Sequence, residues 1–130
     1  MLTELLHIGF VVKSIDAALE QMKRLGAVEI GRKELPAIGQ TSALVQLGNI
    51  RYELMEPLGT EGVVPRFIEK HGEGFHHISF KCGSADDEAA RLLAEGVRLL
   101  GKTPGDGKTK FFTHPKSTGG IIYEINENYD

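Results

Sequence analysis

The chain has 130 residues, a formal net charge of −3 at pH 7 and 41% hydrophobic residues, which is the size and composition of one ordinary globular domain. Its acidic balance excludes a nucleic acid or an anionic membrane surface as the main partner. The single cysteine, Cys82, excludes an intramolecular disulfide, and no apolar run is long enough to cross a bilayer. With no signal-peptide pattern, these features predict a cytoplasmic protein.

The first half of the chain has the pattern of a strand, a helix and three more strands. The expected elements are a strand at 5–12, a helix at 15–25, and strands at 28–33, 41–47 and 50–55. Ser14 is a good N-cap for this helix and Gly26 a good stop. The pair Gly48-Asn49 predicts a hairpin turn between the last two strands.

A turn-rich linker with a short amphipathic helix at 63–71 leads into the second half, where the same order returns. The expected elements there are a strand at 75–82, a helix at 85–95 capped by Ser84, and strands at 98–101, 110–114 and 121–126. The sequence therefore predicts an α+β fold in which two βαβββ modules form one curved mixed sheet with helices on its convex side. We expect a single domain over residues 1–130, with modules at about 1–58 and 74–128.

An internal repeat relates the two halves. His7 and His77 are 70 positions apart (77 − 7), and Glu53 and Glu124 are 71 apart (124 − 53). Each half thus begins with a histidine in one strand and ends with a glutamate in another.

Taken singly, each of these four residues is weak evidence for a site. A strand histidine is usually a hydrogen-bonded structural residue, and a strand glutamate is usually solvated. Their register changes this interpretation, because each one alternates with apolar neighbours. If those neighbours face the helices, the four polar side chains must line the opposite, concave face. We therefore predict a divalent metal site formed by His7, Glu53, His77 and Glu124.

The donor set indicates the metal and the chemistry. Imidazoles with carboxylates and no thiolate suit Co²⁺, Mn²⁺, Ni²⁺, Fe²⁺ or Zn²⁺. Four protein ligands on an open sheet leave room for a substrate oxygen, so the site can stabilise an enediolate. Glu53 and Glu124 are expected on opposite sides of the metal, where they can move a proton from one face of a carbon to the other.

These residues resemble the vicinal oxygen chelate superfamily, whose members consist of paired βαβββ modules, and the resemblance covers nearly the whole chain. Within the superfamily, three stretches are similar to the methylmalonyl-CoA epimerase family. They lie at 52–58 (YELMEPL), at 67–78 (FIEKHGEGFHHI) and at 114–120 (HPKSTGG). The resemblance implies a cofactor of one divalent metal ion held by the four residues above. It also implies epimerisation of an acyl-CoA thioester by α-proton abstraction through a metal-stabilised enolate, and a homodimer.

One position departs from the epimerase pattern. A well-studied type of epimerase has an additional glutamate base on the strand at 40–44, where this chain has Ser42 as the nearest match. Glu53 and Glu124 would then be the proton-transfer residues, with Ser42 as a substrate contact. Lys116 is a second candidate substrate contact, since Lys108, Lys110 and Lys116 cluster near the C-terminal loop, where they either meet acyl-CoA phosphates or are simply solvated.

Other functions remain open. Glyoxalase I has a His, Glu, His, Glu ligand set, so a glyoxalase I-type isomerase or lyase acting on a hemithioacetal is the main alternative. A ring-cleaving dioxygenase is less favoured, because Glu53 adds a carboxylate to its usual two histidines and one carboxylate. A non-enzymatic binding protein of the same superfamily is less favoured because all four ligand positions are intact.

Overall fold

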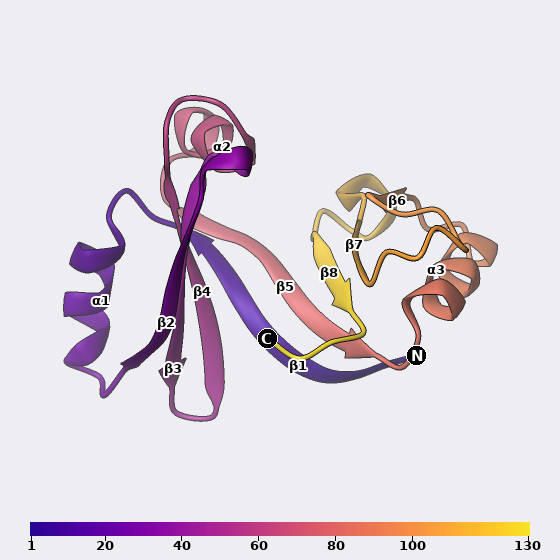
Figure 1. Ribbon diagram of the computed structural model, residues 1–130, viewed down its shortest axis with the longest axis horizontal. Helices are drawn as coiled ribbons and strands as arrows, with labels where there is room; N and C mark the ends of the chain where they lie inside the picture. The colour runs from indigo at the N-terminus through magenta and orange to yellow at the C-terminus, as the bar shows by residue number, and fades with distance from the viewer. The chain divides into compact units, whose positions relative to one another are not determined.

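The computed structural model describes residues 1–130, and its elements follow the predicted order (Figure 1). The strands are β1 (Leu2–Val11), β2 (Val28–Leu35), β3 (Gln40–Leu47), β4 (Ile50–Pro57), β5 (Gly74–Cys82), β6 (Leu99–Leu100), β7 (Lys110–Thr113) and β8 (Tyr123–Asn126). The α-helices are α1 (Ile15–Lys23), α2 (Val63–His71) and α3 (Ala85–Ala94), and 3₁₀ turns occupy Pro36–Ile38 and Pro115–Ser117. The chain forms two compact units, His7–His76 and Met1–Leu6 with His77–Asp130.

The strand pairing repeats between the halves. The eight strands are hydrogen-bonded in the order β2-β3-β4-β1-β5-β8-β7-β6. β1 pairs in parallel with β4, and β5 pairs in parallel with β8, whereas β2-β3, β3-β4, β6-β7 and β7-β8 are antiparallel. This mixed sheet and the three helices confirm the predicted α+β fold of two βαβββ modules.

Several element ends differ from the predicted ones for local reasons. β1 begins at Leu2 and not at residue 5, and Thr3 Oγ1 donates a hydrogen bond to the carbonyl of Lys81 at 3.3 Å. β6 has only two residues, because Gly101 follows it with a φ of 82°. β8 begins at Tyr123 because the amide of Ile121 still belongs to the preceding turn, donating to Thr118 O.

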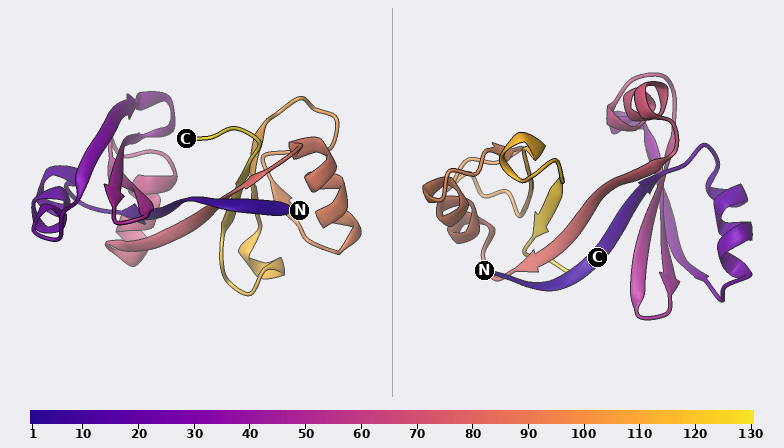
Figure 2. Two further views of the ribbon diagram at one scale, coloured as in Figure 1. Left: turned by 90° about the horizontal axis from the view of Figure 1, so that it is seen from below. Right: turned by 180° about the vertical axis from the view of Figure 1, so that it is seen from behind.

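Two helices cover the apolar strand faces of their own modules. Ile15 and Leu19 of α1 pack against the face of β1 and β4 that carries Phe10 and Leu54, and α1 lies beside this part of the sheet in both views (Figure 2). In the second half, Ala85 and Ala89 of α3 pack against Cys82, Phe111 and Ile125. The alternating side chains of each strand therefore point away from these helices.

Each of these helices has two caps. The Ser14 hydroxyl accepts from the amide of Ala17 at 3.1 Å, and the Ser84 hydroxyl accepts from the amide of Asp87 at 3.2 Å, as predicted for N-caps. In addition, a glutamate near the end of each module accepts from the helix's first amide. The pairs are Ile15 N to Glu56 Oε1 at 2.9 Å and Ala85 N to Glu127 Oε2 at 2.8 Å. A carboxylate at a helix N-terminus also complements the helix dipole.

We expect Glu127→Ala to lower the free energy of unfolding by about 1–2 kcal/mol, because the buried amide of Ala85 loses a charged acceptor. Glu56→Ala should have a similar effect at Ile15, and the double variant should lose roughly the sum. Urea denaturation of the three variants measures these changes. Values near zero for both single variants would contradict the capping role.

Two glycines fix the chain on either side of β3 and β4. Gly39 has a φ of 75° and Gly62 a φ of 121°, a conformation that favours glycine. A Cβ on Gly39 would lie 1.9 Å from Glu61 O, and a Cβ on Gly62 would lie 2.3 Å from Ile38 O. The two backbones therefore touch directly, just before α2 begins.

The loop between β6 and β7 is organised by a buried lysine. The Lys102 ammonium group donates to Asp86 Oδ1 at 2.5 Å, to Asp106 Oδ1 at 2.7 Å and to Lys108 O at 2.8 Å, and its side chain is 0% exposed. These hydrogen bonds from Lys102 hold the pKa values of the Asp86 and Asp106 carboxyls below their usual range, with further donation from backbone amides. Burial opposes the charge on Lys102, but its hydrogen bonds to the two aspartates outweigh burial and raise its pKa.

The carboxylates of this cluster predict an acid-labile contribution to stability. A carboxyl whose folded pKa is depressed stabilises the fold above its unfolded pKa of about 3.9, and this stabilisation disappears as the pH falls below that value. We expect Lys102→Met to lower the thermal midpoint by about 3–8 °C near pH 7, since two partly exposed carboxylates lose their cation. The difference from the unchanged protein should shrink between about pH 4 and pH 2. Thermal melts of the variant and the unchanged protein across this pH range test the prediction. A difference in thermal midpoint that does not depend on pH would contradict the role of the two carboxylates.

None of the helices combines the length and the apolar character that a bilayer-spanning helix needs.

Candidate metal and proton-transfer site

His7 and Glu53 lie side by side on neighbouring strands. The parallel register places Gly9 of β1 opposite Glu53 of β4, so the side chains of His7, Gly9 and Glu53 share one face. This face is opposite to the one covered by α1. His7 Nε2 lies 3.6 Å from Glu53 Oε1, with 5% of the histidine side chain exposed and 23% of the glutamate side chain. The pair therefore offers an imidazole nitrogen and a carboxylate oxygen with little solvent around them.

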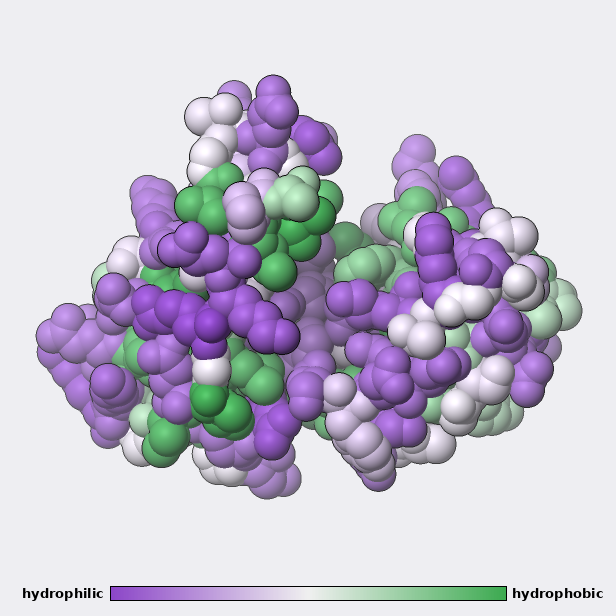
Figure 3. Space-filling model, in the orientation of Figure 1, coloured by the Kyte–Doolittle hydropathy of each residue, from purple (hydrophilic) through white to green (hydrophobic).

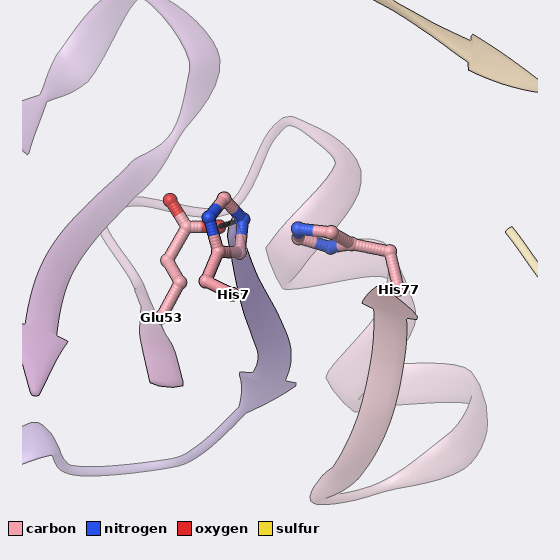
Figure 4. A group of neighbouring side chains, drawn as sticks. All are labelled: His7, Glu53 and His77. Atoms are coloured by element: carbon pink, nitrogen blue, oxygen red, sulfur yellow. Dashed lines mark ion pairs between the residues drawn. The ribbon is translucent and has the colours of Figure 1, made fainter. Parts of the chain in front are cut away.

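His77 completes a group of three possible metal ligands (Figure 4). His7, Glu53 and His77 each offer one ligand atom, and these atoms all lie within 4.8 Å of one another. The donor set of two imidazoles and one carboxylate fits a first-row divalent metal.

Glu124 lies in the unit that contains His77. β5 and β8 pair with Ser79 opposite Glu124, and His77 is two residues before Ser79 on the same face. Glu124 is 5% exposed, and its Oε1 lies 3.9 Å from the ammonium group of Lys110. The group of three ligands does not include Glu124, so its role as the fourth ligand stays a prediction.

Residues around this second-half pair were not predicted from the sequence. The ring of Phe112 meets the ring of His77 edge-on, with centroids 5.9 Å apart and planes at 88°. Lys110 belongs to the lysine cluster for which the sequence leaves both phosphate binding and simple solvation open, and its ammonium group lies 3.9 Å from Glu124 Oε1. The β7 register places Phe112 opposite Glu124, a pairing that alternation alone could have suggested once the two strands were known to be adjacent.

The two candidate substrate residues occupy different surroundings. Ser42 pairs with Met55, two residues beyond Glu53, so its side chain is on the same face as Glu53. The Ser42 hydroxyl accepts a hydrogen bond from the Gln40 side chain at 2.8 Å. Lys116 is exposed in the 3₁₀ turn, where its backbone amide donates to His114 Nδ1 at 3.1 Å. Ser42 thus shares a strand face with the predicted ligand Glu53. Lys116 is exposed, so its long side chain can reach an anion.

The linker helix α2 also borders this site. Val64, Phe67 and Ile68 pack on Val11 and Met55. Val11 follows His7 by four residues and Met55 follows Glu53 by two, so both point to the face that bears these ligands. Unlike α1 and α3, α2 therefore covers the polar side of its strands. The amphipathic pattern of residues 63–71 predicted the helix but not the face on which it packs.

Comparison with protein families identifies relatives of the whole chain. A family model described as "Glyoxalase/Bleomycin resistance protein/Dioxygenase superfamily" matches residues 6–113, which contain His7, Glu53 and His77. The ethylmalonyl-CoA/methylmalonyl-CoA epimerase of Cereibacter sphaeroides is 31% identical over 133 residues, covering 98% of this chain and 99% of the relative.

Solved structures give the same picture. The methylmalonyl-CoA epimerase from Mycobacterium tuberculosis superposes with a TM-score of 0.86 at 29% identity, covering 99% of this chain and 90% of that one. A variant of the Streptomyces coelicolor methylmalonyl-CoA epimerase in complex with 2-nitronate-propionyl-CoA gives a TM-score of 0.84 at 28% identity, covering 96% and 94%. These similarities to epimerases support the prediction that the chain is an isomerase.

Proposed function

Because the chain belongs to the glyoxalase/bleomycin resistance protein/dioxygenase superfamily, we propose that it is a metal-dependent methylmalonyl-CoA epimerase. The single observation that carries the proposal is the convergence of His7, Glu53 and His77 in a chain similar along its length to epimerases of acyl-CoA thioesters. The proposal keeps residues 1–130 as one vicinal oxygen chelate domain that acts as a homodimer.

His7, Glu53 and His77 would hold the metal ion, with Glu124 as the fourth ligand. A divalent cation supplies positive charge that makes the α-proton of the thioester more acidic and stabilises the charge that develops on oxygen. His7 and His77 are 4% and 2% exposed, so the site favours strong electrostatic interactions by keeping most water away.

The two glutamates are the proposed proton carriers. Glu124 would accept the α-proton while the C–H electron pair moves toward the thioester carbonyl, and Glu53, in its protonated form, would return a proton to the opposite face of the same carbon. Glu124 then carries the proton and Glu53 is ionised, so the two carboxyl groups exchange protonation states in each turnover. No carboxylate stands at position 42, so Glu53 takes the role of the additional glutamate of other epimerases. The Lys110 ammonium group lies 3.9 Å from Glu124 Oε1, so a cation neighbours the proposed base.

A glyoxalase I-type isomerisation is the second candidate function. Two observations favour it: Glu53 gives the ligand positions a His, Glu, His, Glu sequence, and Ser42 is hydrogen-bonded to Gln40 where an epimerase base is expected. The reaction also moves a proton between carbons through an enediolate, so the same glutamates can perform it.

Proton NMR in deuterated water distinguishes the two functions. Protein loaded with Co²⁺ or Mn²⁺ is mixed with methylmalonyl-CoA and, separately, with the hemithioacetal of methylglyoxal and a thiol. We expect metal-dependent loss of the methylmalonyl α-proton signal with epimerisation, and no loss in chelator-treated protein. Conversion of the hemithioacetal alone would replace the proposal by a glyoxalase-type isomerase.

A further inference from the structure

A pocket separate from the group of metal ligands lies along one side of α2. It has a volume of about 300 Å³ and is lined by Val63, Arg66, Phe67, Lys70 and His71. These residues are at positions i, i+3, i+4, i+7 and i+8, which is one continuous stripe on a helix. We call this set the α2 stripe. It lies entirely within the unit formed by residues 7–76.

The α2 stripe combines two permanent cations with flat rings. The guanidinium group of Arg66 and the ammonium group of Lys70 are on exposed residues one helical turn apart. Between them, the ring of Phe67 lies 4.9 Å from that of His71 and 5.2 Å from that of His76, measured between centroids. Figure 3 shows hydrophobic residues next to hydrophilic ones over this helix. Glu69 is the one carboxylate on α2, and it does not line the pocket.

This combination matches a phosphorylated nucleotide. Arginine and lysine bind phosphate oxygens, arginine in a bidentate manner and lysine as a point charge. Aromatic side chains stack on nucleobases, with a gain of about 1–3 kcal/mol per base in single-stranded nucleic acid complexes. A pocket lined by cations and rings but by no carboxylate therefore fits a base that carries phosphate groups better than it fits a cationic or purely apolar ligand.

The position of α2 relative to the ligands His7 and Glu53 fits one particular nucleotide. The adjacent side of α2 packs on Met55, two residues beyond Glu53, and Phe67 belongs both to this side and to the α2 stripe. Two residues of strand span about 7 Å, and the helix with its side chains is about 10 Å thick. The α2 stripe is thus separated from Glu53 by a span that an extended pantetheine arm can bridge. In an acyl-CoA, that arm joins the reacting thioester to adenosine 3′,5′-bisphosphate.

We propose that the α2 stripe binds the phosphorylated adenosine of the acyl-CoA substrate, an inference that rests on the proposed epimerase function. Arg66 and Lys70 pair with its phosphates, and Phe67 and His71 receive the adenine ring. Lys108, Lys110 and Lys116 are the alternative cations for these phosphates. Of these, Lys110 has its ammonium group 3.9 Å from Glu124 Oε1 and is thus already paired with a carboxylate.

The first experiment measures binding without catalysis. Adenosine 3′,5′-bisphosphate is titrated into the full chain, with ¹H–¹⁵N NMR shifts and calorimetry as readouts. We expect the largest shifts at residues 63–71 and at least a tenfold loss of affinity in the double variant Arg66→Glu/Lys70→Glu. The control is Lys23→Glu at the exposed end of α1, which alters charge on the opposite face of the sheet and should bind normally. Shifts confined to residues 108–116, or unchanged affinity in the double variant, would overturn the inference.

The second experiment uses turnover. The double variant should raise KM for methylmalonyl-CoA at least tenfold with kcat nearly unchanged, whereas KM for methylmalonyl-pantetheine, which lacks the nucleotide, should be the same in both proteins. An equal rise in KM for both substrates would reveal a structural effect on the site and overturn the inference. If the bisphosphate binds α2 but neither thioester is epimerised, the proposed function fails while the nucleotide site stands. If both thioesters turn over with equal KM in the unchanged protein and no bisphosphate binds, the proposed epimerase function stands and the proposed nucleotide site fails.

Discussion

Replacing Glu124 with glutamine is expected to lower the rate of α-proton exchange in methylmalonyl-CoA by about 10²–10⁴-fold, to below detection. Positioned general bases contribute about this factor, and glutamine retains the shape of glutamate without its basicity. Glu124 is suited to this role because it is almost fully buried on β8 and lies beside the ammonium group of Lys110. The measurement is the loss of the α-proton NMR signal in deuterated water.

Metal content must be measured in the same variant, because Glu124 is also a predicted ligand. The informative comparison is between variant and unchanged protein at equal metal occupancy. Glu95→Gln, at the exposed C-terminal end of α3, makes the same chemical change elsewhere in the unit and should exchange the proton normally. Full exchange by metal-loaded Glu124→Gln would show that Glu124 is not the essential base.

Replacing His7 with alanine is expected to reduce affinity for a divalent metal by at least about 100-fold and to abolish proton exchange at micromolar metal. Loss of a hydrogen-bond partner of a ligand already costs about 10–100-fold, and His7 is itself a member of the three-residue group. Titration with Co²⁺, followed by visible absorption, reports both affinity and geometry. His77→Ala should behave in the same way.

The control for this experiment is His114→Ala, which removes an imidazole from the 3₁₀ turn outside the ligand group. This variant should bind metal as the unchanged protein does. Equal metal affinity in His7→Ala and His114→Ala would contradict the ligand assignment, and it would favour a non-enzymatic or metal-free function for the chain.

The repeat in the sequence predicted most of the fold. The 70-residue offset located both strand histidines, and Ser14 and Ser84 cap their helices as their residue type predicts. Polar alternation on β1 and β4 placed His7 and Glu53 on one face, as the parallel register shows. These features are local or periodic, so a single sequence contains them.

Features that depend on tertiary contacts were not predictable. The packing of Val64 and Phe67 on Val11 joins segments 53 and 56 residues apart (64 − 11 and 67 − 11), and no periodic signal indicates which face of the strands is covered. The contact between Lys110 and Glu124 likewise depends on the antiparallel register of β7 and β8. No local pattern distinguishes Lys102 from the other lysines of the chain, and only the folded loop brings two aspartates to its ammonium group.

The direct backbone contact between Gly39 and Gly62 has a consequence for how the sequence can vary. Each glycine leaves room for a carbonyl of the other segment, so a larger residue at either position collides with main chain that no side-chain rotation can move. A substitution at one position cannot be rescued at the other, because both sites lack space for the same reason. In a library that randomises residues 36–39 and 58–62 together, both glycines should persist while their neighbours diversify. Both glycines before α2 must therefore be kept together, whereas the exposed residues of the helix itself can change to suit different ligands.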